Sequence, residues 1–136
     1  MRKLLLVGAI LLLSGCATLS NVKDARGSGH SRIYNVTYQK VWEAVPRAIS
    51  ILGPSIVSID EKAGRILAET PVFQFASYGE VIAVFVEKMD ETHTKVEVVS
   101  RKRMATNIFA YSYQDRILDG LDRELGVQTV GQATSR

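Results

Sequence analysis

The chain has 136 residues, of which 46% are hydrophobic and 23% charged, a composition that suits one globular domain and is marginal for two. The formal charge is +3, and removal of residues 1–15 would leave +1, whereas a basic nucleic-acid reader keeps a strong positive surplus. The single cysteine, Cys16, excludes a disulfide within the chain.

The first sixteen residues have the pattern of a targeting segment. A cationic start precedes an apolar run over residues 4–13, interrupted by Gly8, and the run ends in Leu13-Ser14-Gly15-Cys16. This order resembles a bacterial lipoprotein signal peptide that ends in a lipobox. The resemblance implies that residues 1–15 are removed and that Cys16 becomes the lipid-carrying first residue, with palmitate among its acyl chains.

Two other interpretations of this segment remain open, a transmembrane helix and an ordinary cleaved secretory signal. A bilayer core needs about 20 apolar residues, whereas runs of about 10–14 are typical of the apolar part of a signal peptide. Charged residues follow soon, at Lys23, Asp24 and Arg26, and a plain secretory site does not require a cysteine. The pattern therefore favours the lipoprotein.

Lipidation of Cys16 would decide where the protein is located. Lipoproteins of this type resemble one another in carrying three acyl chains, and each buried methylene contributes about 0.8 kcal/mol to membrane binding. In enteric-type sorting an aspartate after the cysteine favours the inner membrane. Ala17 therefore predicts the outer membrane, facing the periplasm, with the inner membrane as the alternative. Loss of Arg2 and Lys3 with the signal would lower the formal charge from +3 to +1.

Residues 16–30 are predicted to form the lipidated N-terminus and a flexible tether. The part from residue 18 onward is small and polar, and it offers too little apolar surface to offset the entropy of ordering. A flexible coil of about 13 residues has an r.m.s. reach of roughly 20 Å. The domain would then move freely, but close to the membrane.

A strand at residues 31–36 and a helix at residues 38–52 are predicted next. Apolar residues recur at three- and four-residue steps along the helix, Thr37 can cap its start, and Gly53-Pro54 can end it. Pro46 lies on the polar side of this pattern. A bend there can curve the helix around a sheet without disturbing its buried face.

Four more strands in a meander and a second helix complete the prediction. The strands are expected at residues 55–60, 65–70, 80–87 and 94–100. Alternation in the last strand predicts one largely solvent-exposed face. The helix is expected to begin at Ser112, where Ser112-x-x-Asp115 forms a capping box, and to end at Gly126. Gly120 beside its apolar stripe suggests a close approach to the sheet, and residues 127–136 are expected to be a loose tail.

The predicted order is β-α-β-β-β-β-α, an α+β domain over residues 31–126 in which two helices pack on one face of an antiparallel sheet. This arrangement resembles the helix-grip or TBP-like folds. Among lipoproteins it is similar to the globular repeats of BamC, an accessory of the outer-membrane β-barrel assembly machinery. The residues that carry the similarity are Tyr34-x3-Tyr38-x3-Trp42-x-Ala44, Gly53 and Asp60-x3-Gly64-Arg65-Ile66. A fold-level analogy of this kind transfers no functional site.

The sequence contains no motif of a catalytic or metal site. His30, in the predicted tether, and His93, at a turn, have no partner at metal-ligand spacing, and Cys16 would be occupied by lipid. The paired carboxylates Asp90-Glu91 also lie in a turn, where a solvated surface is expected. We therefore expect no catalytic residue, no metal ligand and no cofactor, and a protein that is not an enzyme.

A group of aromatic and cationic residues is a candidate contact surface. The loop after the third strand and the chain leaving the fifth are expected to emerge at the same end of the meander. Aromatic residues beside arginine and lysine suit a protein interface or the interfacial zone of an anionic leaflet. The alternative is that the aromatic residues join the core and the basic residues form a solvated strand end. The residues concerned are Phe73, Phe75, Tyr78, Arg101, Lys102, Arg103, Met104, Phe109 and Tyr111.

Two classes of function follow from the sequence. The favoured one is a membrane-anchored, non-catalytic module that contacts an envelope protein or assists envelope assembly, with no nucleic-acid partner. The other is a carrier that holds a lipid or similar amphiphile between the long helix and the sheet. A carrier needs an enclosed apolar cavity of several hundred Å³, and the large residues on both helix stripes favour a filled interior.

Overall fold

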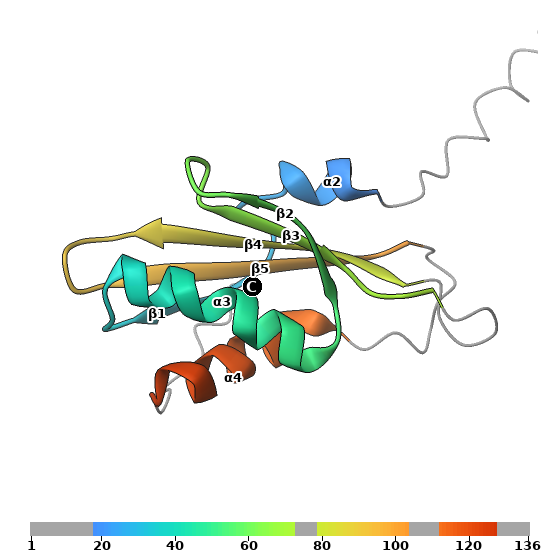
Figure 1. Ribbon diagram of the computed structural model, residues 1–136. Helices are drawn as coiled ribbons and strands as arrows, with labels where there is room; N and C mark the ends of the chain where they lie inside the picture. Colours follow the sequence, from blue (N-terminus) through green and yellow to red (C-terminus); the bar gives the residue numbers. More distant parts are fainter. Residues whose placement is uncertain (1–17, 73–78, 104–111, 128–136) are drawn as a thin grey trace, which may run out of the picture.

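A computed structural model describes residues 18–72, 79–103 and 112–127. Its sheet is antiparallel throughout, and the strand order is β1-β5-β4-β3-β2 (Figure 1). The predicted meander is therefore confirmed, and the first strand in the chain pairs with the last one, His30 opposite Val98. The strands are β1 (His30–Tyr34), β2 (Ser55–Asp60), β3 (Arg65–Glu69), β4 (Glu80–Lys88) and β5 (Thr94–Lys102).

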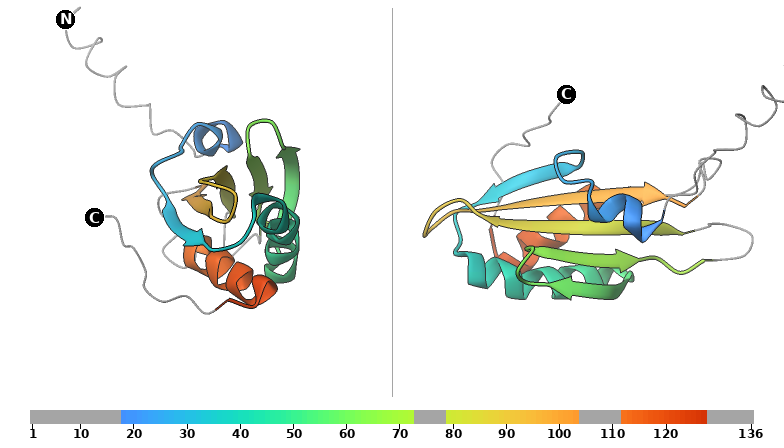
Figure 2. Two further views of the ribbon diagram at one scale, coloured as in Figure 1. Left: turned by 90° about the vertical axis from the view of Figure 1, so that its left-hand side faces the viewer. Right: turned by 90° about the horizontal axis from the view of Figure 1, so that it is seen from above.

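Helices α3 (Tyr38–Leu52) and α4 (Tyr113–Leu125) cover one face of this sheet, as predicted (Figure 2, left). Residues that alternate along each strand point at them, because side chains at i and i+2 share a face. The α+β class and the packing of two helices on one face follow from this core. Its strand members are Tyr34, Ile66, Ala68, Ile82, Val84, Val86, Val96 and Val98.

The predicted helix ends are confirmed in part: Ser112 caps α4, but through Gln114, while Asp115 of the predicted capping box contacts His30. The side chain of Ser112 accepts a hydrogen bond from the backbone N–H of Gln114, and left-handed glycines end both helices, Gly53 with φ 105° and Gly126 with φ 64°. Thr37 stands at the N-cap position of α3, but its side chain makes no capping hydrogen bond. Val127, assigned to the loose tail, instead donates its N–H to the Asp122 carbonyl at 3.0 Å and packs against the core. Residues 128–136 lie outside the described residues.

Gly120 marks a close approach between the two helices and not, as predicted, between helix and sheet. A Cβ at this position would lie 3.5 Å from Leu52 Cδ1 and 3.7 Å from Ala48 Cβ, both on α3. The sequence pattern placed Gly120 next to an apolar stripe, but it could not tell which element faces that stripe. The small residues on both sides let the helix backbones come together.

The prediction of a flexible tether is wrong for residues 18–30. They form a short helix, α2 (Leu19–Lys23), and a connection that lie on the sheet face opposite α3 and α4 (Figure 2, right). Val22 is fully buried, and Leu19 and Ala25 pack beside it. The polar composition of this segment does not reveal that Leu19, Val22 and Ala25 recur at three-residue steps. The second core that receives them consists of Leu67, Val81, Ala83, Phe85 and Val99.

The second face of β5 is also less exposed than predicted. Glu97 is buried, and its Oε1 accepts hydrogen bonds from the backbone N–H groups of Gly27, at 2.7 Å, and Gly29, at 2.8 Å. A buried carboxylate is tolerated where such donors replace water. The connection after α2 therefore covers this part of the sheet, and the domain begins at Leu19 and not at Ser31. Within the described ranges, no helix has the length and apolar content needed to cross a membrane.

Candidate functional site

The segment closest to the predicted lipid site is fixed to the sheet by several side chains. Arg26 places its guanidinium 4.7 Å above the centre of the Phe85 ring and donates to the Ala63 carbonyl at 3.0 Å. Arg65 donates to the Lys23 carbonyl at 3.3 Å, and Arg101 donates to Ser28 Oγ at 3.0 Å. Cys16 itself lies outside the described residues, two positions before Thr18. The described fold thus begins two residues after the predicted lipidation point.

The face that carries α2, called here the α2 face, presents both basic and acidic side chains to solvent. Cross-strand partners share a face of a sheet, so the row Ile33, Lys95 and Glu87 lies on it, as does Arg101 at the other end of β5. Ile33 is 59% exposed. Two acidic residues of this face are engaged, since Glu87 pairs with Arg26 at 3.9 Å and Glu97 binds backbone N–H groups, whereas Asp24 is exposed.

The predicted contact group is only partly described. Both segments do leave the same end of the sheet, because Glu80 pairs with Lys102 and the N–H of Arg103 donates to the Gly79 carbonyl at 3.1 Å. This part of the prediction is confirmed. The aromatic and apolar members lie outside the described residues, and their role as a contact surface stays a prediction: Phe73, Phe75, Tyr78, Met104, Phe109 and Tyr111.

The three basic residues of that group point in different directions and do not form one patch. Arg101 lies on the α2 face beside Ser28, whereas Lys102 faces the opposite side, where its charge acts on Glu80. Arg103 is paired with Glu69 at 2.5 Å. Alternation along a strand accounts for this division, since adjacent residues occupy opposite faces. Arg101 and Arg103 therefore lie on the side of the α2 face, where Arg103 is paired with Glu69, and Lys102 lies on the opposite side.

Glu80 is a buried carboxylate that the sequence did not single out. It is 2% exposed and lies at the start of β4, on the face covered by α4. Burial raises the pKa of Glu80, and the Ser100 hydroxyl, the Tyr113 backbone N–H and the charges of Lys102 and Arg116 lower it by less. A glutamate at the start of a strand usually indicates a solvated end, so sequence gave no signal for this burial.

A second polar group missed by sequence reasoning joins β1 to α4. The Arg32 side chain is 5% exposed and donates to Asp119 Oδ1 and Asp122 Oδ2, each at 2.7 Å. Tyr34 donates to Asp122 Oδ1 at 2.8 Å. Burial lowers the pKa of Arg32, but the hydrogen bond to Asp119 and the charge of Asp122 outweigh it and raise the pKa overall. These contacts fix the edge strand to the helix.

Each histidine of the described ranges lies beside an acidic side chain. His30 Nδ1 lies 2.9 Å from Asp115 Oδ1, and His93 Nδ1 lies 3.0 Å from Asp90 Oδ2, both at the surface. Among residues 18–72, 79–103 and 112–127, no three histidine, cysteine or acidic side chains gather as metal ligands would. An open depression of about 230 Å³ lies where β1 leads into α3. Its lining comprises Asn35, Val36, Thr37, Lys40 and Thr92.

The space in which a carrier would hold its ligand is filled by side chains in the described part of the domain. Side chains from α3, β4 and α4 pack together there, and Ile49, Ile82 and Leu121 among them have no solvent-exposed surface. An amphiphile of ordinary size needs several hundred Å³ of enclosed apolar volume, which this packing does not leave. In comparisons with known proteins, no family model matches the chain and no curated protein is significantly similar to it.

Proposed function

We propose that the protein is a lipoprotein of the outer membrane, anchored through acyl chains on Cys16 and facing the periplasm, whose domain is a non-catalytic protein-interaction or envelope-assembly accessory with a helix-grip arrangement. The observation that carries the anchor is the position of Leu13-Ser14-Gly15-Cys16 just ahead of the ordered domain. Both described cores are built from residues after Cys16. Cleavage before Cys16 would therefore leave them intact.

The interaction role is supported by the edge strand β2. Val57 and Ile59 are exposed on it, and β2 stands at one end of the strand order, next to β3. An edge strand with apolar side chains and an open row of backbone groups suits the addition of a strand from another protein. The filled core argues against the carrier, so the interaction module is the better-supported function.

The anchor is tested by metabolic labelling with a palmitate analogue. The wild-type protein should incorporate label and fractionate with outer membranes, whereas Cys16→Ser should lose both properties. Ser14→Ala, which leaves the predicted acceptor in place, is the matched control and should still incorporate label. If the wild-type protein incorporates no label, and Cys16→Ser fractionates as the wild type does, the proposed anchor is wrong.

The interaction role is tested by photo-crosslinking in cells. A photoreactive amino acid at Val57 or Ile59 should capture an envelope protein, and one at Glu43, which is exposed on α3, should capture less of it. Val57→Lys should reduce capture from position 59 through charge at the edge. Equal adducts from all three positions, or none from β2, would exclude this edge as the contact.

A further inference from the structure

We propose that the α2 face lies directly against the membrane surface, where its basic side chains contact lipid phosphates, so that the domain is held in one orientation. This inference rests on the proposed lipid anchor at Cys16. It replaces the picture of a domain moving on a flexible tether with that of a domain docked on the anionic periplasmic leaflet.

The first argument is the length of chain between lipid and fold. Consecutive Cα atoms are about 3.8 Å apart, so the two steps from Cys16 to Thr18 span at most about 7–8 Å. A disordered tether would have reached roughly 20 Å. The start of α2 must therefore stay close to the acylated residue, and the sheet must follow α2.

The second argument is that α2 is built into the domain. Val22 is fully buried in the second core, Arg26 lies over Phe85, and the Lys23 carbonyl accepts from Arg65. Downstream, two hydrogen bonds from Gly27 and Gly29 to Glu97 fix the connection. Releasing α2 would break all of these contacts. The anchor therefore positions the whole sheet and not a loose terminus.

The third argument is charge. Lys23 and Arg101 are exposed on the α2 face and Lys95 is partly exposed, while Glu87 and Glu69 are paired with Arg26 and Arg103. Asp24 and Glu87 are the exposed acids beside them, and of these Asp24 has no cationic partner among the described residues. Arg101 donates to the neutral hydroxyl of Ser28 and thus keeps its positive charge unbalanced. Basic side chains close to an anionic leaflet gain from its negative potential.

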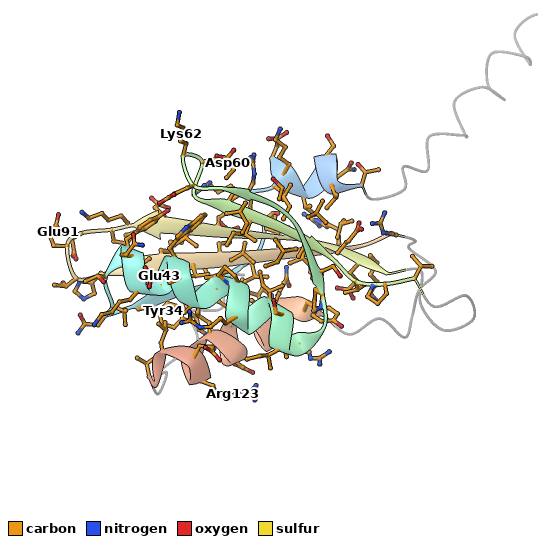
Figure 3. The ribbon with its side chains drawn as sticks, viewed as in Figure 1. Tyr34, Glu43, Asp60, Lys62, Glu91 and Arg123 are labelled. Atoms are coloured by element: carbon orange, nitrogen blue, oxygen red, sulfur yellow. The ribbon has the colours of Figure 1, made fainter. Side chains whose placement is uncertain are left out.

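Lys62 and Asp60 lie on the side of α2, whereas Glu43 and Arg123 lie on the side of α3 and α4 (Figure 3). On the α2 face the exposed Ile33 stands next to Lys95, a pairing of apolar and cationic groups that suits the lipid interface. In this orientation α3 and α4 face away from the membrane.

The experiment uses the full-length lipidated protein in vesicles of phosphatidylethanolamine and phosphatidylglycerol. Ile33→Cys and Ile51→Cys replace two exposed isoleucines, 59% and 73% exposed, on opposite sides of the domain. Each receives a fluorophore, and a lipid with a spin-labelled headgroup quenches it. We expect several-fold stronger quenching at position 33 than at position 51. Equal quenching at the two positions would overturn the inference.

Two further changes test separately whether the basic side chains and the short link to Cys16 cause the orientation. Lys23→Glu with Lys95→Glu should reduce the contrast between the two positions, whereas the control Lys40→Glu with Arg123→Glu should leave it unchanged. A Gly-Ser spacer inserted between Ala17 and Thr18 should also reduce it. An unchanged contrast in both the α2-face and the spacer variants would contradict the proposed cause of the orientation.

Intact mass measurement distinguishes failure of the inference from failure of the anchor. Acyl chains on Cys16 together with equal quenching would overturn the docked orientation alone. A mature protein without acyl chains would overturn the anchor and, with it, the orientation.

Discussion

Arg32 on the edge strand β1 donates to Asp122 on helix α4 at 2.7 Å, across 90 residues of sequence. Tyr34, two residues along the strand, donates to the same carboxylate. Asp119 completes the group one helical turn before Asp122. Helix α4 is thereby joined to the edge strand β1 by partly buried polar contacts.

Arg32→Ala should lower the free energy of unfolding by about 2–3 kcal/mol, because it removes the hydrogen bonds of a buried guanidinium to the carboxylates of Asp119 and Asp122. Urea denaturation measures the change. Arg47→Ala is the matched control, since Arg47 also pairs with α4, at 3.0 Å from Glu124, but in an exposed pair that should contribute at most about 1 kcal/mol. Equal decreases in unfolding free energy in the two variants would contradict the larger contribution to stability predicted for Arg32.

Glu80 should make the domain less stable at neutral than at mildly acidic pH. Its pKa is raised in the folded state, chiefly by burial, so the folded protein binds the proton more tightly than the unfolded chain. This contribution is present below the unfolded-state pKa and is lost as the pH rises through the folded-state pKa. Glu80→Gln removes the ionisation and should gain stability relative to wild type at neutral pH.

The measurement for Glu80 is urea unfolding at several pH values. The stability advantage of Glu80→Gln should shrink as the pH falls. Glu43→Gln changes an exposed glutamate on α3 and serves as the control with no such trend. An advantage of Glu80→Gln that stays constant with pH would show that the ionisation of Glu80 does not affect folding.

Val22→Ala should cost about 2 kcal/mol of unfolding free energy, because it removes two buried methyl groups from the second core. It should also speed tryptic cleavage after Lys23 and Arg26 by loosening α2. Ser20→Ala, on the exposed side of the same helix, should change stability by less than about 0.5 kcal/mol. A neutral Val22→Ala variant would indicate that residues 18–30 are the tether that composition predicted.

Gly120→Ala should raise the free energy of unfolding by about 0.5–1 kcal/mol, because alanine is the better helix former and the new Cβ has room. Its nearest neighbours would be Leu52 Cδ1 at 3.5 Å and Ala48 Cβ at 3.7 Å, which are ordinary contacts. Gly120→Leu should instead cost about 1–3 kcal/mol by forcing α3 and α4 apart. Thermal unfolding of the two variants should shift in opposite directions.

Periodicity in the sequence was sufficient to predict the two long helices and all five strands, because α3 and α4 carry apolar stripes and β2 to β5 are separated by clear turns. It could not predict α2. Five residues are too few to show a period, and their burial depends on Phe85 and Val99, which lie far along the chain. For the same reason the second face of β5 was expected to be exposed, although a loop 70 residues earlier covers Glu97.

Among the candidate sites, too, those with a local sequence pattern could be predicted and those that depend on distant residues could not. Cys16 could be proposed because its signal is local in sequence. The Arg32 contacts and the burial of Glu80 could not, because they require β1 to pair with β5 and α4 to fold back over both. The separation of Arg101 from Lys102 follows from strand alternation and was open to prediction once β5 was assigned.

The pairing of β1 with β5 also bears on when the domain can fold. His30 meets Val98, so the earliest strand gains its neighbour only after most of the chain is available. Its hydrogen bonds to α4 come later still. Contacts between such distant residues form slowly, because a long loop must close first. A chain that emerges N-terminus first could therefore pair β1 with the sheet only after β5 has emerged, late in the process.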